Sequence, residues 1–61
     1  MNLASLILAI VDHMTVNRGR APDHVLAPAH KVEEWDRPDA LGVPIRAWDK
    51  PAIVLVSGEH P

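Results

Sequence analysis

The sequence predicts a small α+β fold, with one long and one short helix against a three-stranded, mainly antiparallel sheet in the order α-β-α-β-β. Three observations support this class. Apolar residues recur with helical spacing near the start of the chain, a β-branched run lies near its end, and segments rich in Pro, Gly and Asp separate the elements. At 61 residues the chain is long enough for one domain, 1–61, with a polar tail from about residue 57.

The first helix is expected over 2–17. Its apolar residues fall at i, i+3, i+4, i+7 and i+11: Leu3, Leu6, Ile7, Ile10 and Met14. Asn2 is a suitable N-cap, and Gly19 is expected to be the left-handed residue after the helix. Leu8 and Val11 widen the apolar stripe beyond one face, so we expect more than the sheet to cover this helix.

A short strand is expected at 24–27, followed by a short helix over about 28–36. Pro28 suits the first position of a helix, where no backbone donor is needed. Val32 and Trp35 are three residues apart and are expected to face the core. The segment 36–42 contains many turn-forming residues and is expected to be a loop.

Two strands are expected in the last third of the chain. Residues 43–48 alternate in polarity, and Pro44 favours a position near a sheet edge because it lacks a backbone donor. The run 52–56 is continuously apolar and β-branched, which is typical of a strand covered on both faces. Residues 49–51 are expected to join the two strands as a short hairpin loop.

Composition limits the classes of function. A net charge of −2 argues against a general nucleic-acid binder, which needs a basic face. Without cysteine, disulfides and thiolate metal sites are excluded. Domains of this size usually need a further source of stability, so we expect a homo-oligomer or a subunit of a larger assembly.

The apolar stretch Leu3–Val11 raises the question of a membrane segment. It is too short to span a bilayer, which takes about 20 residues. A secretory signal would have a basic residue before its apolar stretch, and no basic residue precedes this one. We therefore expect a cytoplasmic protein, or a virion protein if the chain is structural, and no membrane partner.

The residues that could carry chemistry are scattered. His13, His24, His30 and His60 fall on different expected elements, without the spacing that places two imidazoles on one face, so no metal is expected. Ser5 and Ser57 lack a nucleophile motif, and the glycines are too far apart for a phosphate loop. The sequence therefore predicts a non-enzyme with no catalytic residues and no cofactor.

Partner binding is expected at Trp48, Arg46, Arg18 and Arg20. Trp and Arg are enriched in interface hot spots. Strand alternation places Trp48 beside Arg46 on an outer face, although Trp48 is also compatible with the edge of the core. Arg18 and Arg20 form a small basic turn, for which the alternative is a solvated helix end whose charge suits the helix dipole.

Two stretches resemble tailed-phage major capsid proteins. They are Arg20-Ala21-Pro22-Asp23-His24-Val25-Leu26-Ala27-Pro28 and Leu41-Gly42-Val43-Pro44-Ile45. In those capsid proteins a long helix leads to a strand, a helix, a strand of similar Gly-Ile-Pro-Val type and a closing strand. The resemblance covers the order of elements over about 3–56. It implies a phage or prophage origin and an assembly or inhibitory role, and it assigns no site residues.

The expected function is that of a small non-enzymatic protein–protein interaction module, as in a phage-encoded inhibitor or assembly factor. One alternative is a structural component of a virion. A second alternative is a small DNA-binding or antitoxin-like regulator, which would need a basic face that this composition does not favour. The expected partner is another protein.

Overall fold

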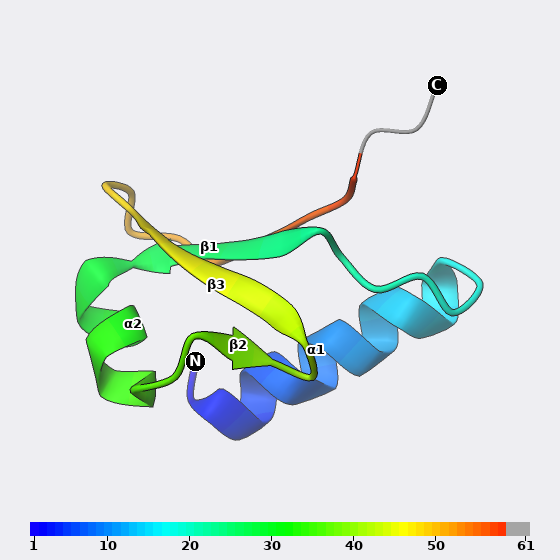
Figure 1. Ribbon diagram of the computed structural model, residues 1–61, viewed down its shortest axis with the longest axis horizontal. Helices are drawn as coiled ribbons and strands as arrows, with labels where there is room; N and C mark the ends of the chain where they lie inside the picture. Colours follow the sequence, from blue (N-terminus) through cyan, green and yellow to red (C-terminus); the bar gives the residue numbers. More distant parts are fainter. Residues whose placement is uncertain (59–61) are drawn as a thin grey trace.

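The computed structural model describes residues 1–58 and contains two helices and one four-stranded mixed sheet (Figure 1). The elements in chain order are α1 (Leu3–Val16), β1 (His24–Pro28), α2 (Ala29–Trp35), β2 (Asp39–Ala40), β3 (Val43–Trp48) and β4 (Val54–Val56). The α+β class is confirmed, but the expectation of three mainly antiparallel strands is wrong. Residues 59–61, part of the expected polar tail, lie outside the described residues.

Helix α1 begins where the sequence predicts and ends differently. The Asn2 side chain accepts a hydrogen bond of 2.8 Å from the Ser5 backbone N–H, which confirms it as the N-cap. At the other end Arg18 takes the left-handed position with φ 58°, and Gly19 follows with φ 85°. The Gly19 N–H donates to the Met14 carbonyl at 2.7 Å, closing a Schellman motif one residue earlier than predicted.

The sheet has the order β2-β3-β1-β4, and its two central strands, β3 and β1, run parallel to each other. Val25 of β1 pairs with Ile45 of β3 in parallel and with Leu55 of β4 in antiparallel register. The parallel pair has a simple cause. Helix α2 follows β1 and carries the chain back toward the end of the sheet where β1 began, so β3 runs in the same direction as β1.

The expected loop 36–42 contains the short strand β2. Ala40 pairs with Val43, and Leu41 and Gly42 between them have φ values of 52° and 79°. Positive φ at both central residues is the signature of the type I′ hairpin turn, whose twist matches that of the strands. The hairpin turn therefore lies here and not at 49–51.

The expectation for the last strand is also wrong. β4 spans only Val54–Val56 and lies at an edge of the sheet, with Val54 38% exposed, so it is not covered on both faces. Strands β3 and β4 are not neighbours because β1 lies between them. The connection 49–53 therefore has to pass the end of β1, and the Trp48 indole N–H holds it by donating to the Ala52 carbonyl at 2.7 Å.

Both helices pack on the same face of the sheet (Figure 1). The buried cluster comprises Leu6, Ile10, Val25, Ala27, Trp35, Ala40, Val43 and Ile45. Cross-strand partners share a face, so Leu26, Arg46 and Val54 lie together on the other face, which no helix of the described chain covers. The fold is thus two layers deep, and α1 and this open sheet face lie on opposite sides of the molecule.

Candidate functional site

Helix α1 presents a second apolar stripe away from the core. The stripe, here called the outer stripe, consists of Ala4, Leu8, Val11 and Thr15, all exposed. At about 100° per residue these four positions fall within one arc of about 60°, well separated from Leu6 and Ile10, which are buried. Leu8 is 69% exposed and Val11 46%. The second apolar side of α1 is therefore exposed in the described chain, and the expectation that something besides the sheet covers it stays a prediction.

The open sheet face carries two of the predicted partner-binding residues. Arg46 and Trp48 alternate with Ile45 along β3 and lie opposite Leu26 and Pro28 of β1. Arg46 is exposed, whereas Trp48 is half-buried and uses its indole N–H within the chain. Trp48 therefore fastens the β3–β4 connection and also contributes surface to this face.

The other two predicted residues, Arg18 and Arg20, lie elsewhere. They belong to the turn after α1, which leads into the start of β1, whereas Trp48 pairs with the last residue of β1. Figure 1 places this turn and the β3–β4 connection at opposite ends of the sheet. The four predicted residues thus form two separate surfaces and not one patch.

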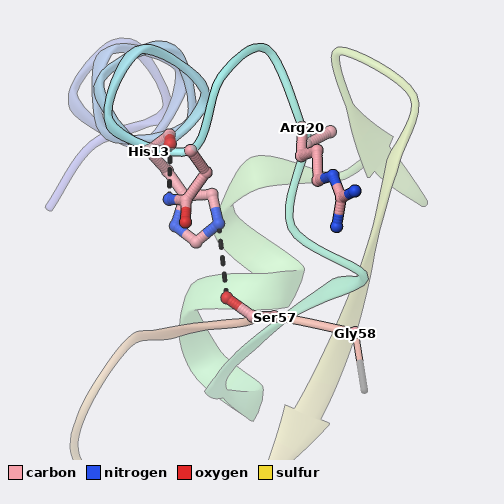
Figure 2. Close-up of a pocket in the computed structure, with 6 residues that line it drawn as sticks. His13, Arg20, Ser57 and Gly58 are labelled. Atoms are coloured by element: carbon pink, nitrogen blue, oxygen red, sulfur yellow. Dashed lines mark hydrogen bonds between the residues drawn. The ribbon is translucent and has the colours of Figure 1, made fainter. Parts of the chain in front are cut away.

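A depression of about 660 Å³ lies between the end of α1, the basic turn and the end of β4 (Figure 2). The residues that line it are His13, Asn17, Arg20, Ala21, Ser57 and Gly58. The His13 ring points toward Ser57, and the His13 Nε2 and Ser57 Oγ atoms are 3.5 Å apart, the outer limit of a hydrogen bond. A smaller hollow of about 350 Å³ shares Asn17 and Arg20 with it and is also lined by Arg18.

The backbone around this depression is already well bonded. Asn17 donates to the His13 carbonyl twice, from its backbone N–H at 3.0 Å and from its side-chain Nδ2 at 2.7 Å. The Thr15 hydroxyl donates to the Val11 carbonyl at 3.0 Å. The Asn17 and Gly19 bonds occupy the His13 and Met14 carbonyl groups at the end of α1, which would otherwise point at solvent.

The three histidines that the structure describes do not gather into a metal site. His24 Nδ1 lies 2.8 Å from an Asp23 carboxylate oxygen, His13 faces Ser57, and His30 is exposed on α2. Within residues 1–58 no group of three His, Asp or Glu side chains is placed to hold a metal ion. His60 lies outside the described residues. None of the helices in the described chain has the length and apolar character needed to cross a membrane.

The sequence did not predict the contact between His13 and Ser57. They are 44 positions apart, and neither belongs to a local motif. Their contact depends on β4 pairing antiparallel to β1, which returns the end of β4 to the end of α1. Only a correct strand order could have indicated this pair.

Comparison with known protein families, with curated proteins and with solved structures gives no match to this chain. The resemblance to phage capsid proteins therefore stays a prediction from the residues that carry it.

Proposed function

We propose that the chain is a small non-enzymatic protein–protein interaction module that pairs with another α-helix through the outer stripe of α1. The observation that carries this proposal is the exposure of Leu8 and Val11, large aliphatic side chains on a helix whose other face is already buried. Large exposed apolar patches on small domains are typical of interaction surfaces.

The spacing of the outer stripe favours a helical partner. Residues 4, 8, 11 and 15 are separated by steps of four, three and four, which is the spacing of a coiled-coil seam. Ala4 is small and allows close approach at one end. The Thr15 hydroxyl is bonded to its own helix, so the seam presents mainly the methyl group of this residue.

With a second copy of the chain as the occupant, the charge on α1 favours an antiparallel pair of helices. Asp12 is the only Asp, Glu, Lys or Arg in Leu3–Val16. In an antiparallel pair that aligns Leu8 with Val11 of the other copy, the two Asp12 residues are offset by about 7.5 Å along the axis. A parallel pair would place the two Asp12 residues at the same height along the axis, where their like charges lie closest. The antiparallel arrangement also opposes the two helix dipoles favourably.

The experiment is sedimentation velocity from micromolar to near-millimolar concentration. The seam is only about two heptads long, so we expect weak, concentration-dependent dimerisation. Leu8→Lys should abolish the dimer because it places a charge within the apolar contact. Val16→Lys is the matched control, since Val16 is also exposed on α1, at 74%, but lies outside the outer stripe.

Two results would contradict the proposal. One is a wild-type chain that stays monomeric up to near-millimolar concentration. The other is an equal loss of association in both lysine variants, which would indicate a general charge effect and not a specific seam. Circular dichroism of each variant establishes that the fold is retained, as expected for substitutions at exposed positions.

A further inference from the structure

The depression of Figure 2 is lined by several side chains that can donate hydrogen bonds. None of its lining residues in the described chain is Asp or Glu. We infer that it binds a small phosphorylated molecule through the phosphate group. The inference does not depend on the proposed helix pairing, because the depression involves none of the residues of the outer stripe.

Arg20 is the principal donor. Its guanidinium carries five N–H groups in a planar fork that matches the oxygen atoms of a phosphate. Across residues 1–58 no acidic side chain forms an ion pair with Arg20. Arg18 adds a second positive charge in the adjoining hollow. The segment 13–22 contains no Asp or Glu, although the chain as a whole is acidic.

The end of a helix normally disfavours an anion, because its unbonded carbonyl groups carry partial negative charge. Here that opposition is weakened. Hydrogen bonds from Asn17 and Gly19 already occupy the carbonyls of His13 and Met14. The unfavourable effect of the helix end on an anion is therefore reduced, and Arg20 and Arg18 place two positive charges beside the depression.

The donors approach the open space from three elements. His13 comes from α1, Arg20 from the turn before β1, and Ser57 from the residue after β4 (Figure 2). The Ser57–His13 contact of 3.5 Å is weak, so either group can turn toward an incoming oxygen atom. Convergence of donors from several sides suits a tetrahedral anion better than a flat one.

Size and charge define the class of ligand. A depression of about 660 Å³ falls within the range of small-molecule sites, about 300–1,000 Å³. A nucleic acid would need a basic stripe, and this chain has a net charge of −2. A small phosphomonoester fits the volume, and its single phosphate group needs only the two arginines beside the depression and no basic stripe.

The test is a titration with inorganic phosphate and with phenyl phosphate, followed by amide NMR spectra at constant ionic strength. We expect saturable shifts at Arg20, Ser57 and Gly58 with both probes. Arg20→Gln should weaken binding about tenfold, the scale of one lost hydrogen bond to a charged group. Arg46→Gln is the matched control, because it removes the same charge from the open sheet face and should leave binding unchanged.

Other outcomes would overturn the inference. Sodium chloride that reproduces the shifts would indicate screening only, and acetate that binds as tightly as phosphate would contradict the assignment to phosphate. Equal weakening by Arg20→Gln and Arg46→Gln would indicate a non-specific charge effect. Leu8→Lys should bind phosphate as the wild type does, which separates this test from that of helix pairing. Because Arg20 is exposed, thermal unfolding of Arg20→Gln should match that of the wild type.

Discussion

Trp35 and Trp48 allow the same substitution to be compared at two sites with opposite hydrogen bonding. The Trp35 indole is buried at 7% exposure, and its Nε1 has no hydrogen-bond partner within the described chain. The Trp48 indole is half-buried, and its Nε1 donates to the Ala52 carbonyl at 2.7 Å. We predict that Trp48→Phe destabilises the protein more than Trp35→Phe, although Trp35 is the more deeply buried.

The magnitudes follow from what each substitution removes. Replacing indole by phenyl removes two carbon atoms of apolar contact, about 1.6 kcal/mol when fully buried. At Trp35 it also removes a buried unsatisfied donor, whose desolvation costs about 1–3 kcal/mol, so the net change should lie between a loss of about 0.6 and a gain of about 1.4 kcal/mol. At Trp48 the apolar loss is roughly halved by exposure, but a bond of about 0.5–1.5 kcal/mol is lost, for a total near 2 kcal/mol.

The assay is urea denaturation followed by circular dichroism. The free energies of unfolding are compared between variants whose dependence on urea concentration, the m value, is the same. Each variant keeps one tryptophan, so fluorescence reports separately on the core and on the β3–β4 connection. Trp35→Ala serves as the control for core packing and should cost about 3–5 kcal/mol. A larger loss of stability in Trp35→Phe than in Trp48→Phe would refute the reasoning.

Three further substitutions test the backbone. Leu41→Asn should stabilise the protein by about 0.5–1 kcal/mol, because Leu41 is 58% exposed and holds φ 52° in a turn that favours Asn-Gly. Arg18→Gly should raise the free energy of unfolding by up to about 1 kcal/mol, since Arg18 holds a left-handed conformation. Asn2→Ala should lower it by about 1 kcal/mol through loss of the cap to Ser5. Urea midpoints measure all three, and a change of opposite sign would contradict the corresponding geometry.

Local patterns in the sequence predicted most of the individual elements. Helical spacing located α1 to within one residue at each end, and strict alternation located β3 at Val43–Trp48. Trp35 was expected in the core and is buried there. These features depend on residues close together in the chain, where spacing and side-chain type act directly.

The pairing of strands could not be predicted in the same way. A continuous β-branched run is typical of a central strand, yet Val54 lies at an edge because β1 occupies the position next to β3. Strand β2 has only two residues and is recognisable mainly through the turn at Leu41 and Gly42. The contact between His13 and Ser57 follows from the strand order, so the sequence could not predict this contact without the correct order.

The arrangement of the two layers connects the proposed helix pairing with the predicted partner residues. Both helices lie on one face of the sheet, so pairing through the outer stripe of α1 would leave the open sheet faces of both copies pointing outward (Figure 1). Arg46 and Trp48 would then be presented twice, on opposite sides of the dimer. Two linked copies of a weak site bind a multivalent target more tightly than one copy does, without any new contact. Helix pairing would therefore serve the binding of a larger assembly even though the contact made by each copy is small.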